Sequence, residues 1–515
     1  MKRQRTISQG ALSRTFLAAA EAWKRQEYQE TIDLLERASR LDPANAGLLL
    51  DLGRAHGMRY DYATAERCFE KAIRVAPRQL DALVAAGQRS REIGRTEMAQ
   101  AYLKRASGQP GVAPEVLVAL AEIHERHHRL DEAAALVDRA LTSDGLCAPA
   151  QLFRARLDRL AGSLETAERR VRELIAQPRA DTWTRAQAWY ELGGILDREQ
   201  RHDEAWAAFL EAKALFRPAA APAAAALQGV QARVREMEQT ITDAVLHRWF
   251  ESGAQLQPQR RLALLCGHPR SGTTLLEQAL DAHPDIITAE ETHILHDEAY
   301  LPLSRGFAQE ASVLSVLESA STGLLRRSRE NYFRFTESFL ARTIEHRLLV
   351  DKNPALNTLI PAVVRIFPEA KFLVAIRDPR DVCLSCFMQP LALNPVSSAY
   401  LSVEGTVTQY ASVMGFWQAM LPRLRNAWLE VRYEQLVDDL EPAALRVLDF
   451  LGVPWDARVL RFNEHARTRL VRSPSYAEVT RPVFKSAIGR WRHYQKHLEP
   501  WLSKLEPFVK AHGYG

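Results

Sequence analysis

Small residues recur at one fixed interval through residues 1–216, and this limits what the segment can fold into. They form two columns, namely Ala19, Gly53, Gly87, Ala121 and Ala155, and Ala38, Ala72, Ala106 and Ala140. Between them the apolar residues follow the 3.6-residue periodicity of helices. Small residues at a fixed period indicate closely packed helix pairs that stack on one another. The segment therefore predicts five or six such pairs, the last out of phase near "HDEAWAAFLEAKALF".

The repeated segment resembles the tetratricopeptide repeat family. The stretch "YATAERCFEKAIRVAP" is similar to the second helix of that repeat, and the interval between the small residues matches the length of the repeat. The resemblance implies an all-α superhelix over residues 10–216, with a protein or peptide partner on its concave face. An array that only serves solubility or assembly is the alternative.

Composition excludes several classes of protein. A net charge of +5 on 515 residues, carried by scattered arginines, gives no support for nucleic-acid binding. No apolar run reaches membrane-spanning length, and the basic N-terminus lacks the apolar stretch of a signal peptide. The cysteines are few and dispersed, so we expect a reducing, cytoplasmic compartment: they are Cys68, Cys147, Cys266, Cys383 and Cys386.

The composition changes sharply at "RPAAAPAAAALQ", which begins at Arg217. We interpret residues 217–245 as a proline- and alanine-rich linker with a connecting helix, and residues 246–515 as a second domain. There, strand-like segments such as "LALLCG", "HRLLVDK", "AKFLVAIRD" and "AWLEVRYEQL" alternate with helical ones. This alternation predicts an α/β domain, with a mostly parallel sheet flanked by helices and ligands at the carboxyl ends of the strands.

The loop after the first of these strands reads "GHPRSGTT". Gly267 and Gly272 permit a tight turn whose N–H groups point inward, and a helix starts at the threonines. The loop is P-loop-like, but Thr273 occupies the position of the lysine that a nucleoside triphosphate site requires. Because Arg270 supplies a fixed cation instead, we predict an anion that is held without a metal.

This domain resembles the sulfotransferases that use 3′-phosphoadenosine 5′-phosphosulfate (PAPS). The loop segment "GHPRSGTTLLEQALDAHPDI" is similar to their 5′-phosphosulfate loop, and "KFLVAIRDPRDVCLSCF" to their 3′-phosphate segment. The stretches "VRYEQLVDDLEPAALRVLDFLGVPW" and "FKSAIGRWRHYQKHLEP" follow in the family's order. The resemblance implies PAPS as co-substrate, with binding residues Gly267, Arg270, Ser271, Gly272, Thr273, Thr274, Arg377, Ser385, Tyr433, Lys485, Ser486 and Gly489.

Within that superfamily the motifs "RSGTT", "LDAHP", "EET", "DKNP" and "YEQLV" resemble those of tyrosylprotein sulfotransferases and of bacterial enzymes that carry tetratricopeptide repeats. Two positions depart from the tyrosylprotein pattern. Gln389 stands where that family has an arginine, and Gly489 where it has a serine.

The chemistry of sulfuryl transfer requires a base for the acceptor hydroxyl and cations for the charge that develops on the moving group. Carry-over from "EET" makes Glu291 the base, with His293 in reserve, and we interpret Glu290 as part of a solvated acidic turn. The resemblance places Lys352 near the leaving group and Arg270 on the sulfuryl oxygens or the 5′-phosphate.

These observations predict a PAPS-dependent sulfotransferase that acts on a protein or peptide tyrosine presented by the repeats. The alternatives are a sulfotransferase for a glycan, lipid or small metabolite, and a non-catalytic repeat scaffold. A P-loop kinase is disfavoured by Thr273.

Overall fold

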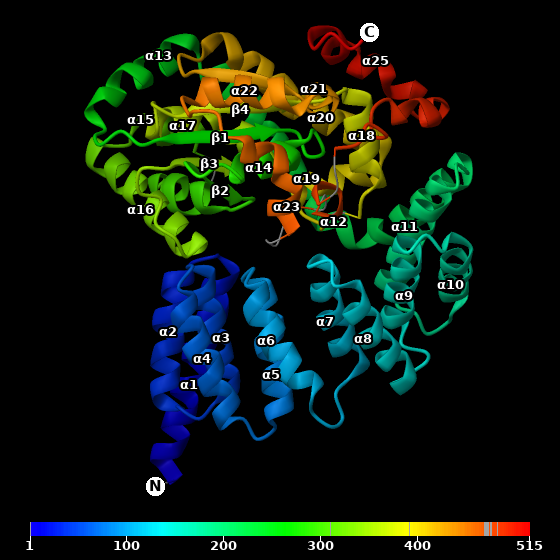
Figure 1. Cartoon of the computed structure of the whole chain (residues 1–515). Coiled ribbons are helices and arrows are strands. Elements are labelled where there is room, and N and C mark those ends of the chain that lie inside the picture. The colour runs from blue at the N-terminus through cyan, green and yellow to red at the C-terminus, as the bar shows by residue number, and fades with distance from the viewer. Residues whose placement is uncertain (1, 309–310, 391, 468–472, 474–475, 481–482) are drawn as a thin grey trace. The chain divides into compact units, whose positions relative to one another are not determined.

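The structure is a computed structural model that describes residues 2–308, 311–390, 392–467, 473, 476–480 and 483–515. The chain forms two compact units, Met1–Leu157 and Asp158–Gly515, which we describe separately. Helices α1–α8 belong to the first unit, α9 spans the boundary, and the parallel sheet belongs to the second (Figure 1).

Residues 2–240 form antiparallel helical hairpins, as the recurring small residues predict. The paired helices are α1 Lys2–Lys24 with α2 Tyr28–Leu41, α3 Ala46–Met58 with α4 Tyr62–Val75, α5 Gln79–Glu92 with α6 Thr96–Ser107, α7 Pro114–Arg126 with α8 Leu130–Ser143, α9 Ala148–Leu160 with α10 Leu164–Ala176, and α11 Thr182–Arg198 with α12 His202–Thr240.

The turn inside each hairpin repeats the same backbone conformation. A residue with positive φ recurs at the interval of the small residues, at Gln26, Tyr60, Gly94, His128 and Gly162. The next is Gln200, which falls later than this interval requires because α11 has 17 residues where α9 has 13. The last repeat is therefore out of phase, as its sequence indicated.

The two columns of small residues lie where paired helices approach each other. The Ala38, Ala72 and Ala106 side chains are fully buried. A Cβ atom at Gly53 would lie 2.6 Å from the Phe69 ring. Packing therefore explains the columns, since a larger side chain would separate the helices.

The segment interpreted as a proline- and alanine-rich linker with a connecting helix is helical from Arg217 to Thr240. Helix α12 continues from His202 to Thr240 and contains Pro218 and Pro222 in its interior. An interior proline removes a backbone hydrogen bond and normally ends or kinks a helix. Here α12 contacts α19 (Pro395–Ser398) and α20 (Val403–Met420), so tertiary packing stabilises a segment whose composition disfavours a helix.

The hairpin α11–α12 packs against the sheet-containing part of its own unit. The Trp206 ring stacks on Phe387 and on His497, with ring centroids 4.6 Å apart in both pairs. The buried Lys213 donates to the Tyr400 carbonyl oxygen at 2.7 Å and to the Tyr190 hydroxyl at 3.1 Å. The second unit, which begins at Asp158, thus contains α10 and the last hairpin together with the sheet.

The sheet has five parallel strands in the order β2-β3-β1-β4-β5. Their bounds are β1 Leu262–Gly267, β2 Ile286–Glu290, β3 Leu348–Lys352, β4 Lys371–Ile376 and β5 Trp428–Arg432. In register, Leu265 lies beside Lys352 of β3 and Leu373 of β4. Because every strand runs in the same direction, the carboxyl ends of all five meet at one edge.

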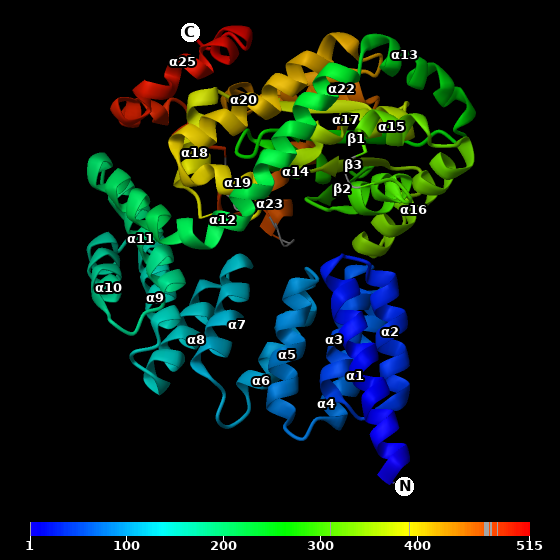
Figure 2. The same ribbon diagram turned by 180° about the vertical axis from the view of Figure 1, so that it is seen from behind.

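Helices lie over both faces of the sheet (Figures 1 and 2). On one face α14 (Thr273–Asp281) and α22 (Leu440–Leu451) bury apolar side chains against Leu265, Val350 and Leu373. None of the helices within the described part of the chain is long and apolar enough to cross a membrane. The remaining α-helices are α13 Asp243–Ser252, α14 Thr273–Asp281, α15 Val313–Glu318, α16 Thr322–Leu340, α17 Ile360–Ile366, α18 Pro379–Met388, α21 Tyr433–Asp438, α22 Leu440–Leu451, α23 Phe462–Arg467, α24 Tyr476–Val479 and α25 Gln495–Ala511.

Replacing Trp206 tests whether the last hairpin is integral to the second unit. Trp206→Ala removes a buried ring that contacts two helices, and we expect it to destabilise the unit by about 3–5 kcal/mol. Trp183→Ala on α11 is the matched control, because that ring is 53% exposed. Urea unfolding followed by circular dichroism measures both. If both variants lose the same small amount of unfolding free energy, the hairpin is dispensable to the stability of this unit.

Candidate functional site

Two glycines shape the loop between β1 and α14. Gly267 has φ 141°, and a Cβ atom there would lie 2.6 Å from the Ala375 carbonyl oxygen of β4. Gly272 has φ 92°, and a Cβ atom there would lie 2.6 Å from the Tyr433 ring. Both positions require glycine, because an L side chain would be strained and would clash. The loop therefore delivers Thr273 and the N-terminus of α14 to the carboxyl edge of the sheet.

A pocket opens at this edge, and its lining brings together predicted residues from distant parts of the chain. Arg270 follows β1, Arg377 follows β4 and Tyr433 follows β5, and all three residues line the pocket. The polar lining consists of Arg270, Thr273, Thr274, Arg377, Asp381, Ser385, Tyr433, Glu478 and Arg490, together with the backbone of Gly272. Apolar side chains from Leu275, Leu384, Val437, Phe462, Val479, Val483, Phe484 and Ala487 complete it. Three arginines and a helix N-terminus outnumber the two carboxylates, and together with the apolar wall they suit an anionic ligand with an aromatic part.

Two of the pocket's three arginines, Arg270 and Arg377, are held in fixed positions. Arg270 has φ 71° and donates from Nε to the Ser385 Oγ at 3.0 Å. Arg377 donates to the Arg270 and Ala487 carbonyl oxygens at 3.1 and 2.6 Å, and its guanidinium lies 4.6 Å from the centroid of the Tyr433 ring. The buried Arg377 Nε has no hydrogen-bond partner among the described residues. An anionic oxygen in the pocket fits this unsatisfied donor.

The C-terminal segment is attached to the start of α18. Asp381 accepts from the Gly489 and Trp491 backbone N–H groups at 2.7 and 2.8 Å. This places Arg490 in the pocket wall. Lys485 is instead exposed and pairs with Asp438 at 2.6 Å. Neither Lys485 nor the exposed Ser486 lines the pocket, so their assignment to the nucleotide stays a prediction.

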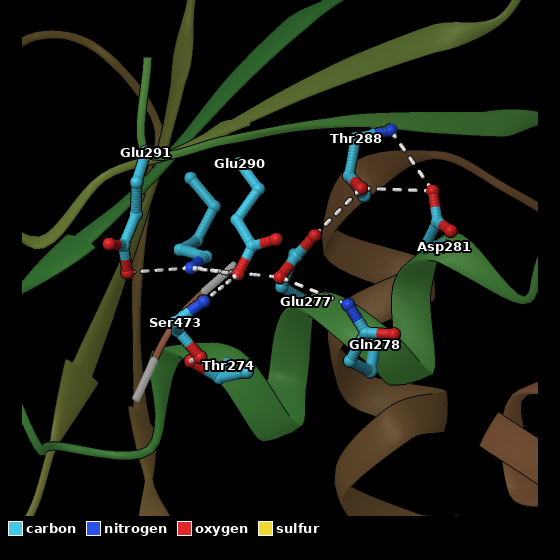
Figure 3. Close-up of polar contacts among 9 residues, drawn as sticks. Thr274, Glu277, Gln278, Asp281, Thr288, Glu290, Glu291 and Ser473 are labelled. Carbon is cyan, nitrogen blue, oxygen red and sulfur yellow. Dashed lines mark hydrogen bonds and ion pairs between the residues drawn. The ribbon is translucent and has the colours of Figure 1, made fainter. Parts of the chain in front are cut away.

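A buried ammonium group lies beside the pocket. Lys352, at the end of β3, is fully buried among three carboxylates, which Figure 3 labels as Glu277, Glu290 and Glu291. Its Nζ lies 2.9 Å from Glu291, 3.2 Å from Glu290 and 3.7 Å from Glu277. Glu291 has φ 49°, and its backbone N–H donates to the Lys352 carbonyl oxygen at 2.7 Å. Two of the predicted catalytic residues, Glu291 and Lys352, are therefore in direct contact.

Glu290 is not the solvated turn residue that the sequence suggested. Its side chain is about nine-tenths buried and accepts from the Ser473 backbone N–H at 3.0 Å as well as from Lys352. The alternation of side chains along β2 explains the difference. Glu290 is the last residue of the strand and points toward α14, whereas Glu291 follows the strand and is 36% exposed at the edge of the sheet.

Two residues of this cluster were missed from the sequence. Glu277 lies one helical turn after Thr274 on α14, and that spacing is the signal that places it on the same face. Ser473 accepts a hydrogen bond from the Thr274 hydroxyl at 3.0 Å and carries no sequence signal of its own. Because Thr274 also lines the pocket, it joins the pocket to the Lys352 cluster.

The histidines near Glu291 have separate surroundings. His283 Nε2 lies 2.8 Å from the Pro454 carbonyl oxygen, and its Nδ1 accepts from the Asp285 backbone N–H at 3.1 Å. Those contacts support a structural role for His283. The His293 side chain is exposed, and His296 pairs with Asp297 at 2.7 Å.

The balance of burial and neighbouring charge raises the pKa values of both Glu277 and Lys352. Burial, and then the charge of Glu290, raise the pKa of Glu277 to about 7, although Lys352 opposes the shift. For Lys352, burial opposes the charged form, but the three carboxylates outweigh it and raise its pKa above the ordinary value. The ammonium therefore persists at neutral pH, whereas Glu277 holds a proton up to about pH 7.

The pH dependence of stability tests this assignment for Glu277. Between pH 4.5 and about 7 Glu277 keeps its proton in the folded state and loses it in the unfolded state, so its contribution to stability falls as pH rises. Glu277→Gln has no titrating group at this position, so this fall in stability with rising pH should disappear. We expect the stability of the variant relative to wild type to rise by about 3 kcal/mol across the window, measured by urea unfolding. A difference that does not vary with pH, or one matched by the exposed Glu499→Gln, would contradict the assignment.

Two parts of the chain match models of known protein families. Residues 263–457 match the model of the sulfotransferase family, and residues 84–146 match a tetratricopeptide repeat model. An uncharacterised protein of Aquifex aeolicus is 24% identical over 351 residues, which cover 65% of this chain and 43% of that protein. The protein-tyrosine sulfotransferase 1 of Danio rerio is 26% identical over 319 residues, covering 55% of this chain and 84% of the relative.

Among solved structures, the sulfotransferase domain of the Synechococcus PCC 7002 olefin synthase aligns with a TM-score of 0.33 and 22% identity, covering 45% of this chain and 88% of that one. The chain spans less than half the length of its Aquifex relative. The tetratricopeptide repeat model matches within the helical hairpins, and the sulfotransferase model matches the part of the chain that forms the sheet. Residues 263–457 are therefore similar to the sulfotransferase family, and residues 84–146 to tetratricopeptide repeats.

Proposed function

We propose that the protein transfers the sulfuryl group of PAPS to a hydroxyl acceptor, namely a tyrosine of a protein or peptide. One observation carries the proposal. The lysine-less anion loop, with Arg270 fixed in it, lies beside a base and a buried ammonium at the same edge of the sheet. The proposal thus combines a site for the donor with the groups that the transfer itself requires.

In the proposed reaction the acceptor oxygen forms a bond to sulfur while the bond from sulfur to the 5′-phosphate oxygen breaks. Glu291 takes the hydroxyl proton, since it is the exposed carboxylate of the cluster. Lys352 and the N–H groups at the start of α14 stabilise the charge on the departing oxygen, and Arg270 stabilises the moving group. The product 3′,5′-bisphosphate leaves with that charge.

The donor is held by groups that do not take part in bond exchange. Arg377 and Ser385 serve the 3′-phosphate, and the unsatisfied Nε of Arg377 supplies a donor for it. Tyr433, which stacks on Arg377, contributes an aromatic face to the nucleotide. A 3′-phosphate contact distinguishes PAPS from ATP, which lacks this group.

The choice of acceptor rests on the likeness to protein-tyrosine sulfotransferases and on the repeats, which generally bind proteins. A peptide is the acceptor class that both features favour. The alternatives are a glycan, lipid or small metabolite as acceptor, and a scaffold without activity. A sulfate-transfer assay with a peptide acceptor distinguishes these alternatives from the proposal.

Nucleotide binding separates the donor classes. The full-length protein should bind adenosine 3′,5′-bisphosphate by isothermal titration in buffer that contains EDTA. ATP with magnesium should bind at least about tenfold more weakly, since one charge-assisted phosphate contact corresponds to roughly that factor. Binding that requires magnesium, or that favours ATP, would exclude the PAPS assignment.

Replacement of the proposed base tests the chemical step. Glu291→Gln should lower turnover on a tyrosine-containing peptide by about 10²- to 10⁴-fold, because the acceptor proton loses its base. Affinity for adenosine 3′,5′-bisphosphate should stay near the wild-type value. Transfer of radiolabelled sulfate from PAPS measures the rate, and His293→Ala is the matched control. An active Glu291→Gln enzyme with an inactive His293→Ala enzyme would reassign the base.

If the peptide is not labelled, the same radiolabelled donor is added to a lysate of the native organism and the labelled species are identified by mass spectrometry. A labelled glycan, lipid or metabolite would replace the peptide as acceptor. No transfer to any species, despite tight nucleotide binding, would favour the scaffold.

A further inference from the structure

The wall of the nucleotide pocket receives a contact from the last repeat. Arg490, which lines the pocket, donates from Nη2 to the Asp197 carboxylate at 2.5 Å. The other oxygen of Asp197 accepts from the Tyr494 hydroxyl at 2.6 Å. Asp197 belongs to α11, whereas Arg490 and Tyr494 lie far from it in the sequence, near the C-terminus. A residue of the repeat hairpin thus contacts a side chain of the pocket directly.

The backbone around Arg490 is fixed by a second carboxylate. Asp381 at the start of α18 binds the N–H groups on either side of Arg490, those of Gly489 and Trp491. This contact sets the position of the backbone but leaves the long Arg490 side chain free to rotate. Asp197 is the carboxylate that the described residues provide for its guanidinium. The two aspartates therefore have separate effects, one on the backbone and one on the side chain.

Asp197 lies at a place on its helix that is unfavourable for a carboxylate. It lies in the last turn of α11, where a negative side chain is unfavourable beside the partial negative charge of the helix end. Its side chain is only 14% exposed. A buried carboxylate at that end of a helix requires cationic or donor partners, and Arg490 and Tyr494 supply them. Trp206 and Lys213 of the same hairpin anchor it against Phe387 and Tyr400.

We propose that Asp197 is a positioning residue for nucleotide binding, which holds the Arg490 guanidinium against the pocket so that it meets a phosphate group of the ligand. The last repeat hairpin is then part of the nucleotide-binding module. This inference rests on the proposed function, because it takes the ligand to be PAPS or its bisphosphate product.

The test compares full-length variants by isothermal titration with adenosine 3′,5′-bisphosphate. Asp197→Asn and Arg490→Gln should each weaken binding by about 10-fold, the scale of one charge-assisted hydrogen bond. The double variant should bind about as weakly as Arg490→Gln alone, because Asp197 acts through Arg490. Asp197→Glu, which keeps the charge, should recover part of the affinity.

Asp203→Asn is the matched control. Asp203 pairs with Lys496 at 2.6 Å and His497 at 3.1 Å between α12 and α25, and neither partner lines the pocket. It should bind the bisphosphate like wild type. The unfolding midpoint of every variant is measured alongside, to separate a local effect from general loss of structure.

Wild-type affinity in Asp197→Asn would overturn the proposal. So would an equal loss in Asp203→Asn, which would indicate a loosened hairpin, or a loss from Asp197→Asn that persists in the Arg490→Gln background. If the wild-type protein itself does not bind adenosine 3′,5′-bisphosphate, the proposed function fails and this inference fails with it.

Discussion

The ion cluster around Lys352 is the interaction on which the site depends. A buried ammonium is costly unless carboxylates surround it, and here they come from α14 and from the end of β2. The cluster is satisfied only when the loop helix and strands β2 and β3 are in register. Electrostatics therefore fixes the arrangement in which Glu291 reaches the solvent and Lys352 lies below it.

Two residues of the site adopt a backbone conformation that non-glycine residues seldom use. Arg270 and Glu291 both have positive φ, at a cost of order 1 kcal/mol or more for each residue. The surrounding hydrogen bonds hold them there, since Arg270 contacts Ser385 and the Glu291 N–H contacts the Lys352 carbonyl oxygen. Such strain often occurs where a side chain must have one orientation, which agrees with the roles proposed for this cation and this base.

The last repeat hairpin packs directly against the part of its unit that contains the sheet. Its residues Trp206 and Lys213 are buried there, in contact with Phe387 and Tyr400. Asp197 extends the same interface to the pocket. This hairpin therefore supplies both packing and a polar contact to the part of the unit that contains the pocket.

The sequence by itself determined the helical hairpins, the parallel sheet and the loop. These features depend on local spacing, since the fixed interval between small residues and the two constrained glycines act over short stretches of chain. It also offered Arg270, Glu291, Lys352 and Arg377 as candidates, because its motifs resemble those of sulfotransferases and lie near strand ends, which meet at one edge of a parallel sheet.

Only the tertiary structure decided what happens between distant segments. It made the proline-containing segment of α12 helical, buried Glu290 with Glu277 and Ser473, and joined Asp197 to Arg490. No local pattern predicts these outcomes. The environment of a carboxylate, or of a proline in a helix, is set by side chains that arrive from elsewhere in the chain, and their proximity exists only once the chain has folded.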